Sequence, residues 1–294
     1  LFMNSSFVPS NVPSVFIYGG SILPGNLNGK TIQIQDVFEA VGKHQSGEIN
    51  DNELYQIESR ACPGPGSCGG MFTANTMSSV GEALGLSLPG SASEPAVDQR
   101  KSASSRLAGE AVLNLLRKDI KPSDILTKEA FENAVTVVTA MGGSTNTCLH
   151  LPAIAYEAGI DLTLEDIHDI SMRTPHLANM KPAGKYLMYD LDNVGGVPLV
   201  MKRLLDLGLI HGECMTVTGK TVRENLESIK DDGIEDEVVR KIDNPISSTG
   251  GLVILHGNLA PDGAVLKVAG HNYGKKWSGP ANVFNQEEEC MEAL

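Results

Sequence analysis

Apolar residues recur every three or four positions along much of the stretch between Ile34 and Ile229, which is typical of amphipathic helices. The clearest case is SRLAGEAVLNLLRKDI, in which Leu107, Ala111 and Leu115 fall on one side of a helix. The pattern predicts helices over residues 34–48, 50–60, 105–120, 127–141 and 144–158, from Leu164 onward, around 197–207 and over 222–229.

Capping residues mark the limits of several of these helices. Thr127 and Thr163 stand directly before apolar runs, where a hydroxyl side chain can accept from the first free backbone N–H groups. Glycines at 142–143 and at 159 end helices, since glycine readily adopts the left-handed conformation of a C-cap. Two helices therefore meet at the sequence MGGSTN, residues 141–146.

Three short β-type runs interrupt the helical pattern. VPSVFIYGG, residues 12–20, is apolar, rich in β-formers and ended by two glycines, which predicts a buried strand that runs into a loop. Residues 252–255 and 264–268 predict two further strands, with Pro261, Asp262 and Gly263 as the turn between them. The change of pattern near Asn244 places a domain boundary around residues 241–250.

Length and charge narrow the class of protein. A chain of 294 residues with 41% hydrophobic side chains can bury a large core, and at about 100–200 residues per domain it favours two domains. The fold class predicted is α/β: a layered α/β domain over 1–244, and the beginning of a β-rich second domain over 245–294. A formal net charge of −13 and a pI near 5.0 argue against a nucleic-acid or acidic-membrane partner. We find no apolar run of about 18 residues and no signal peptide, so we expect a cytosolic protein or the mature part of an organelle protein.

Five cysteines make a poor disulfide framework, because they are odd in number and widely scattered: Cys62, Cys68, Cys148, Cys214 and Cys290. We therefore expect reduced thiols. Spacing alone predicts neither a zinc ribbon nor a complete iron–sulfur site. For the last three of these cysteines a core or surface position is favoured: Cys148 falls on an apolar helix face, and Cys214 and Cys290 have no polar constellation that would form a site around them.

The loop ACPGPGSCGGMFTANTM, residues 61–77, displays one cysteine among glycines. Glycines at 64, 66, 69 and 70 permit sharp turns and a close approach of backbone N–H groups to an anion. A helix of small residues capped near Thr73 follows, which would place Cys68 close to a helix N-terminus where a thiolate is stabilised. Such a thiolate suits a metal or a nucleophile, and an inert buried cysteine in a glycine-rich turn is an equally open interpretation.

A second loop, residues 142–146 (GGSTN), offers two hydroxyls, an amide and backbone N–H groups at a helix start. This is a plausible cradle for an anion or carboxylate, and a simple corner with capping residues is about as good an interpretation. His150 lies close to this loop, and the other histidines are scattered without the spacing of a zinc enzyme.

Several segments together resemble the dihydroxy-acid dehydratases of branched-chain amino acid (valine and isoleucine) biosynthesis. The loop around Cys68 resembles the cluster-binding signature of this family. The family order continues in the segments NVPSVFIYGGSILPG, AMGGSTNTCLHLPAIAYEAGIDLT, NVGGVPLVMKRLLDLGLI and GGLVILHGNLAPDGAVLKVAG. The related sugar-acid dehydratases are the alternative within the same architecture, and GGMFTANTM favours the dihydroxy-acid branch.

The resemblance implies a hydro-lyase in which three cysteines hold a 2Fe-2S or 4Fe-4S cluster and one iron keeps an open position. That iron would act on the C3 hydroxyl of a small 2,3-dihydroxy acid while a base takes the C2 proton, and the enol formed would become a 2-keto acid. A nearby Mg²⁺ would bind the carboxylate side of the substrate. Carried onto this chain, Cys68 is the cluster ligand, whereas Cys62 is a neighbour that we do not count as one. The family also implies a homodimer and a barrel-like second domain.

The family's other two cluster cysteines, and the magnesium ligands of its Cys-Asp-Lys motif, would precede the NVPSVFIYGG segment and are absent here. The serine base and a further magnesium-binding glutamate would come beyond Leu294. Since the chain also starts at Leu1 and ends within an apparent helix, we expect a central fragment that is inactive alone.

Two other functions stay open at this stage. Cys68 could act as the nucleophile of a hydrolase or transferase with His150 as its base. The chain could instead be a scaffold or binding protein that keeps the fold without the chemistry.

Overall fold

The computed structural model describes residues 7–231, 237–269 and 278–293, so Leu1–Ser6 of the opening segment and Leu294 lie outside the described residues. The helices are α1 (Phe7–Ser10), α2 (Ile34–Gln45), α3 (Asp51–Ala61), α4 (Thr73–Ala83), α5 (Arg100–Lys118), α6 (Pro122–Ile125), α7 (Lys128–Ala140), α8 (Thr147–Glu157), α9 (Leu164–Arg173), α10 (Met188–Asn193), α11 (Gly196–Asp206), α12 (Val222–Leu226) and α13 (Glu287–Ala293). The strands are β1 (Gly25–Leu27), β2 (Lys30–Ile32), β3 (Leu252–Gly257) and β4 (Ala260–Lys267).

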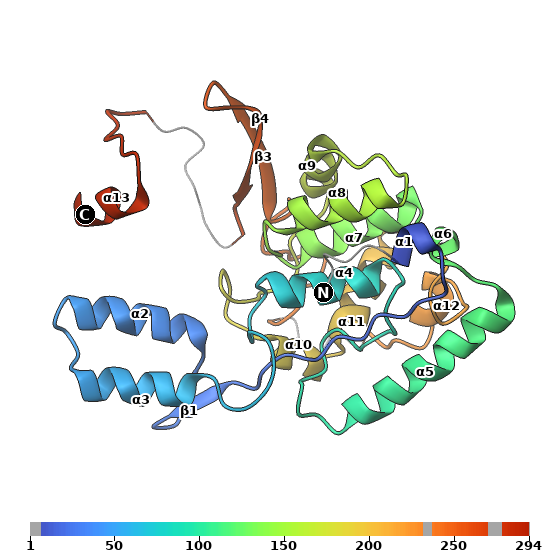
Figure 1. The fold of residues 1–294 in the computed structure, drawn as a ribbon, viewed down its shortest axis with the longest axis horizontal. Helices are drawn as coiled ribbons and strands as arrows, with labels where there is room; N and C mark the ends of the chain where they lie inside the picture. The colour runs from blue at the N-terminus through green and yellow to red at the C-terminus, as the bar shows by residue number, and fades with distance from the viewer. Residues whose placement is uncertain (1–6, 232–236, 270–277, 294) are drawn as a thin grey trace.

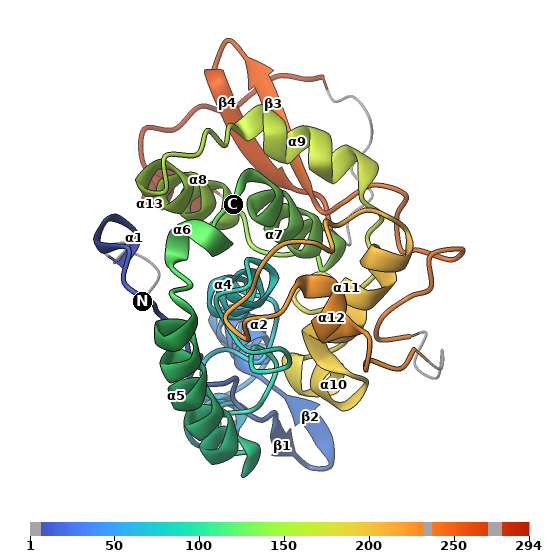
Figure 2. The same ribbon diagram turned by 90° about the vertical axis from the view of Figure 1, so that its right-hand side faces the viewer.

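Helix α4 lies at the centre of the molecule, with α7, α8 and α11 packed around it and α5 along one outer edge (Figure 2). Residues 75–83 of α4 are all buried, and most are small, which lets neighbouring helices approach closely. Helix α7 is buried at Ala130, Phe131 and residues 133–140, and it makes the main contact with α4. The core is therefore helix on helix, and the segments at both ends of α4 are held against it.

The predicted helices with strong periodicity and clear caps are confirmed. Thr127 accepts from the backbone N–H of Ala130 at the start of α7, and Thr163 accepts from Asp166 N–H at the start of α9. Helix α5 begins earlier than predicted, at Arg100, and α12 ends earlier, at Leu226.

The predicted buried strand over residues 12–20 is wrong. This segment is extended and forms no strand of a sheet among the described residues: Phe16 makes an isolated parallel bridge with Ser87, in which Phe16 N–H donates to Leu86 O at 2.8 Å. Val12 and Ile17 are about half exposed (54% and 47%), so the run is not enclosed on both faces. An apolar run of this length does not distinguish a sheet strand from an extended segment that packs on loops.

The hairpin β1–β2 was not predicted, although its signal is present in the sequence. Asn28 and Gly29 connect the strands with φ of 53° and 83°, the left-handed conformations that a two-residue hairpin turn requires. This hairpin packs on α3, and with α2 the group projects from the main body (Figure 1).

The strands β3 and β4 confirm the two predicted runs, but the turn lies elsewhere. Gly257 pairs with Ala260, so residues 258–259 make the turn and Pro261 lies inside β4. Proline has no N–H to donate, and in a two-stranded pair each strand has a free edge on which that loss costs nothing. The hairpin rests on α9, where His168 Nδ1 accepts from Ile254 N–H at 3.2 Å.

The architecture is thus mixed α/β, dominated by helices, with small two-stranded sheets. In the described stretch 237–269 the strands form one antiparallel pair, and no closed barrel is present there. The charged run near the C-terminus forms the exposed helix α13, as predicted. Within the described ranges, none of the helices combines the length and apolar character needed to cross a membrane.

Candidate functional site

The loop that carries Cys68 is fastened to the segment Gly20–Ile22. Ser67 N–H donates to Gly20 O at 3.0 Å, and Ile22 N–H donates to Ser67 O at 2.7 Å. Gly66 has φ of 138°, and a Cβ on it would lie 2.4 Å from the backbone nitrogen of Ile22. Glycine is therefore required for the two backbones to meet at this point.

Asn75, the first residue of α4's buried stretch, holds the same loop from inside. Its amide Nδ2 donates to the carbonyls of Cys68 and Gly70, the latter at 2.6 Å. Its Oδ1 accepts from the hydroxyl of Tyr18 at 2.6 Å, and Tyr18 also hydrogen-bonds Ser67. Asn75 is completely buried, so these bonds form away from solvent and hold the backbone on both sides of Cys68.

Tyr18 remains a neutral hydrogen-bond donor at neutral pH. Burial raises the pKa of Tyr18 to about 12, against the lowering effect of its Ser67 bond, and a negative charge on Cys68 raises it further. Burial, followed by a charge on Cys68, also raises the pKa of the Cys62 thiol. Tyr18 and Cys62 are thus both within electrostatic reach of a charge on Cys68.

The thiols of Cys68 and Cys62 are exposed. The N-cap of the following helix is Phe72, without a side-chain cap bond, so Thr73 is the first helical residue rather than the cap. Cys68 therefore lies four positions before the N-cap and is separated from the helix end by a glycine-rich turn, so the support of its thiolate by that end stays a prediction.

The GGSTN loop meets the Cys68 loop at the first turn of α4. Asn146 Nδ2 donates to Thr73 Oγ1 at 2.6 Å, Ser144 Oγ lies 3.3 Å from Thr73 Oγ1, and Ser144 N–H donates to Thr76 Oγ1 at 3.0 Å. A Cβ on Gly143 would lie 2.5 Å from Val138 Cγ1, so this corner needs glycine. Ser144 and Asn146 thus bind protein groups in this structure, as residues of a corner between two helices would, and α4 brings the two loops together. The anion cradle stays a prediction.

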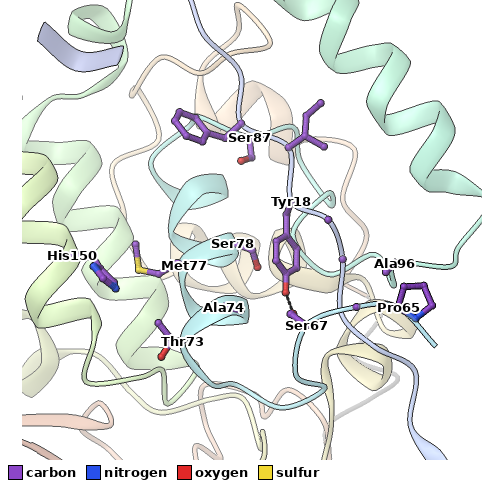
Figure 3. A pocket seen from close by; sticks show the side chains of 15 residues that line it. Tyr18, Pro65, Ser67, Thr73, Ala74, Met77, Ser78, Ser87, Ala96 and His150 are labelled. Carbon is purple, nitrogen blue, oxygen red and sulfur yellow. Dashed lines mark hydrogen bonds between the residues drawn. The ribbon is translucent and has the colours of Figure 1, made fainter. Parts of the chain in front are cut away.

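A cavity of about 620 Å³ opens beside these loops (Figure 3). Most of its walls are apolar, and Tyr18, Ser67 and Thr73 supply hydroxyl groups. The lining residues are Phe16, Ile17, Tyr18, Gly19, Gly20, Pro65, Gly66, Ser67, Thr73, Ala74, Met77, Ser78, Ser87, Ala96 and His150. A pocket of this size and character suits a small organic ligand.

His150 lines this cavity and Cys68 does not. A nucleophile and its base would need a hydrogen bond between them, and in the part of the chain that the structure describes none joins the Cys68 thiol to the His150 ring.

The other cysteines lie where packing roles would place them. Burial raises the pKa of Cys148 and of Cys214 to about 11 each, which fits their predicted packing roles, and Cys290 lies half-buried on α13.

A metal or cluster must find its donors among thiolates, imidazoles and carboxylates. Among residues 7–231, 237–269 and 278–293, no group of three such side chains is gathered closely enough to hold a metal ion. Cys68 supplies one exposed thiol on a firmly held loop. The described residues alone do not fit a three-cysteine cluster, and a magnesium site is likewise not assembled by them.

Asn75, Tyr18 and Ser21 were missed by the sequence analysis. Asn75 stands in the quoted loop one turn into the helix, where a buried amide among small residues was the available signal. Tyr18 ends the apolar run and Ser21 follows it, and neither could be linked to the Cys68 loop without the fold, because 49 positions separate Tyr18 from Ser67.

Comparison with known protein families matches both parts of the chain. Residues 3–225 match the dihydroxy-acid/6-phosphogluconate dehydratase N-terminal domain, and residues 237–294 match the C-terminal domain of the same family. The chain belongs to this dehydratase family. The resemblance seen around Cys68 therefore extends over nearly the whole sequence.

Curated relatives point in the same direction. The chain is 57% identical over 286 residues to "Dihydroxy-acid dehydratase 2" of Staphylococcus saprophyticus, with 97% of this chain and 50% of that protein covered. It is 56% identical over 285 residues to a dihydroxy-acid dehydratase of Sulfurisphaera tokodaii, with 97% and 51% covered. A third, from Oceanobacillus iheyensis, is 53% identical over 285 residues, with the same shares covered. The chain spans about half the length of these dehydratases.

Proposed function

We propose that this chain is part of a lyase that removes water from a small 2,3-dihydroxy carboxylic acid and releases a 2-keto acid, in the synthesis of branched-chain amino acids. The reaction removes the proton of C2 and the hydroxyl of C3 as water, and the resulting enol takes up a proton at C3 to give the ketone at C2. Membership of the dehydratase family supports this reaction class. The names of the relatives favour the dihydroxy-acid branch over the sugar-acid branch.

The observation that carries the proposal is the exposed thiol of Cys68 on a loop fixed through Ser67 and Asn75. A free cysteine in a simple turn has no need of a buried amide that binds its own carbonyl. A ligand of an iron–sulfur cluster does need such support, because the positions of its thiolates determine whether the cluster assembles. We assign Cys68 as one ligand of a 2Fe-2S or 4Fe-4S cluster, which would supply a Lewis acid for the leaving hydroxyl.

Further parts of the proposal come from the family. The remaining cluster thiolates, the Mg²⁺ ligands and the base belong to portions of the protein other than the described residues. The hairpin β3–β4 is proposed to begin a barrel-like second domain, with the boundary around residues 241–250. The working unit is proposed to be a homodimer in the cytoplasm, or in an organelle matrix or stroma, that acts on small molecules and binds neither nucleic acid nor membrane.

A chimera tests the role of Cys68. Residues 3–294 of this chain would replace the matching half of the Staphylococcus saprophyticus relative, and the purified chimera would be assayed anaerobically for 2-keto acid and for cluster absorption. We expect Cys68→Ala to reduce the rate by more than roughly 100-fold and to remove the absorption, since residues that merely support a metal ligand cost about 10–100-fold.

Cys62→Ala is the matched control, because Cys62 is also exposed and lies on the same loop. We expect this variant to keep both cluster and activity. A Cys68→Ala chimera that retains its absorption and its rate would contradict the assignment, and equal losses in the two variants would show that Cys62 is also a ligand.

A further inference from the structure

Glu82 is a buried carboxyl in the last turn of α4, at the opposite end of the helix from the Cys68 loop. Only 4% of the residue is exposed. One carboxyl oxygen accepts from Gly90 N–H at 2.7 Å and the other from Ala92 N–H at 3.1 Å. Burial of a carboxyl is costly unless its oxygens are hydrogen-bonded, so these two bonds are a specific feature of the fold.

The loop that Glu82 holds connects α4 to α5 and contains neither helix nor strand. Ala92 in this loop is buried, and its carbonyl accepts from Ser78 Oγ at 3.2 Å. Glu82 and Ser78 lie one turn apart on α4. Hydrogen bonds from two successive turns of α4 therefore hold the loop.

Beyond Ala92 the loop reaches the Cys68 site. Ala96 N–H donates to Ser21 O at 2.9 Å, and Ser21 forms parallel bridges with Pro95 on one side and with Ser67 on the other. A Cβ on Gly20 would lie 2.5 Å from the Cα of Ala96, so the loop and the segment Gly20–Ile22 are in direct backbone contact. The position of Ala96 thus sets the position of Ser21, and through it that of Ser67.

The charged groups that face Glu82 are few. Glu94 and Lys101 act on it electrostatically, but Lys101 Nζ pairs with Glu94 at 3.3 Å, and Glu94 also accepts from Ser104 Oγ. Burial, the largest effect, raises the pKa of Glu82 to about 7, while the bonds from Gly90 and Ala92 lower it. Its protonation therefore changes within an accessible pH range.

We propose that Glu82 is a positioning residue for the Cys68 loop: by binding Gly90 and Ala92 it fixes Ala96 against Ser21, and so holds Ser67 and Cys68 in place. The proposal rests on the proposed function, because that function gives the Cys68 loop its role as a cluster site. The coupling between Glu82 and Cys68 itself can be measured on this chain alone.

The test uses the 294-residue chain without cluster or substrate. Amide signals would be followed by NMR from pH 5 to 8.5, and the alkylation rate of Cys68 would be measured by mass spectrometry. In the parent chain we expect the signals of Gly90 and Ala92 to move downfield with a midpoint near 7, because hydrogen bonds to a carboxylate are stronger than those to a neutral acid. The signals of Ser21 and Ser67 should shift with the same midpoint.

Glu82→Gln should abolish this titration. The introduced side-chain NH2 group cannot accept a hydrogen bond, so the backbone N–H of either Gly90 or Ala92 loses its acceptor. Hydrogen exchange of that backbone amide should accelerate roughly tenfold or more. The alkylation rate of Cys68 should change with it, while exchange in the buried α7 stays as in the parent. Glu110→Gln, an exposed glutamate on α5, is the matched control and should leave all these readouts unchanged.

Two results would overturn the proposal. If the amide signals of Gly90 and Ala92 titrate while those of Ser21 and Ser67 do not respond, the effect of Glu82 is confined to the loop between α4 and α5. Unchanged Cys68 reactivity in a folded Glu82→Gln chain would lead to the same conclusion. Should Glu82→Gln fail to fold, the pH series of the parent chain alone decides between these outcomes. None of these readouts depends on cluster formation, so failure of the chimera assay would be distinguished from failure of this coupling.

Discussion

Gly64 and Gly66 stand two positions apart in the Cys68 loop, and both have a positive φ, of 85° and 138°. Their surroundings differ. A Cβ on Gly64 would meet nothing within 4 Å, whereas a Cβ on Gly66 would overlap the backbone of Ile22. A side chain at Gly64 would therefore add conformational strain alone, whereas a side chain at Gly66 would add a steric clash as well.

We expect Gly64→Ala to destabilise the chain by about 1–2 kcal/mol, the cost of a left-handed conformation. Gly66→Ala should cost more, on the order of 3 kcal/mol or above, because it adds a backbone clash that forces the loop away from Ser21. Urea unfolding of both variants measures the difference. Equal losses would show that the contact between Gly66 and Ile22 is not maintained in solution.

At the scale of elements, helix caps explain why several boundaries could be predicted. The Thr163 side chain accepts from Asp166 N–H, and the Asp166 side chain accepts in turn from Thr163 N–H. This pair, together with hydrogen bonding to Lys128, lowers the pKa of the Asp166 carboxyl. The N-cap of helix α5 is Gln99, which makes no such side-chain bond, and the beginning of the helix at Arg100 was predicted five residues too late.

Thr163→Ala should reduce the free energy of unfolding by about 1 kcal/mol, within a range of roughly 0.5–2, because one N–H at the start of α9 loses its acceptor. Gln99→Ala is the control at an N-cap without a side-chain bond and should change stability little. Thermal or urea unfolding measures both. A loss in the Gln99 variant that matches the loss in the Thr163 variant would argue against the capping explanation.

Local pattern and capping predicted the helices, whereas the extended segments depended on partners distant in sequence. The apolar run ending at Tyr18 has the composition of a strand, yet within the described residues its β-type pairing is an isolated bridge between Phe16 and Ser87. The turn residues Pro261–Gly263 fell inside a strand, because register along β3 placed the turn at 258–259. Asn28–Gly29, by contrast, was a sufficient local signal for a hairpin and was not used.

The same distinction holds for the site. Cys68 and the GGSTN loop could be selected because glycine and hydroxyl residues concentrate there. Asn75 could not be assigned, since its importance lies in contacts with Tyr18, 57 positions earlier, and with the carbonyl of Cys68. Residues that hold a site in place are defined by the fold rather than by local composition.

At the scale of the whole molecule, two buried groups give stability opposite dependences on pH. The pKa of Glu82 is raised from 4.5 to about 7, so the folded chain binds the carboxyl proton more tightly than the unfolded chain does. The stability that protonated Glu82 contributes is therefore lost as pH rises from about 4.5 to 7. Burial lowers the pKa of His176 from 6.5 to about 4, so the stability that His176 contributes is lost as pH falls through the same range. The two effects partly cancel in the parent chain.

The difference between the parent chain and Glu82→Gln isolates the carboxyl. We expect the parent to lose on the order of 2–3 kcal/mol relative to the variant between pH 5 and pH 7.5, since a pKa unit corresponds to about 1.4 kcal/mol. Urea unfolding at a series of pH values gives this difference curve. A flat curve would show that Glu82 titrates near its ordinary pKa in the folded chain.

The cavity described beside the Cys68 loop is assembled from distant parts of the chain, from Phe16 through Met77 and Ala96 to His150. Contacts between such distant residues form late in folding, because the intervening chain must first be ordered. During synthesis, the wall that contains Tyr18 leaves the ribosome long before the wall that contains His150. The cavity is therefore completed only after α7 and α8 have been made, and until then the exposed thiol of Cys68 is carried on a loop whose surroundings are unfinished.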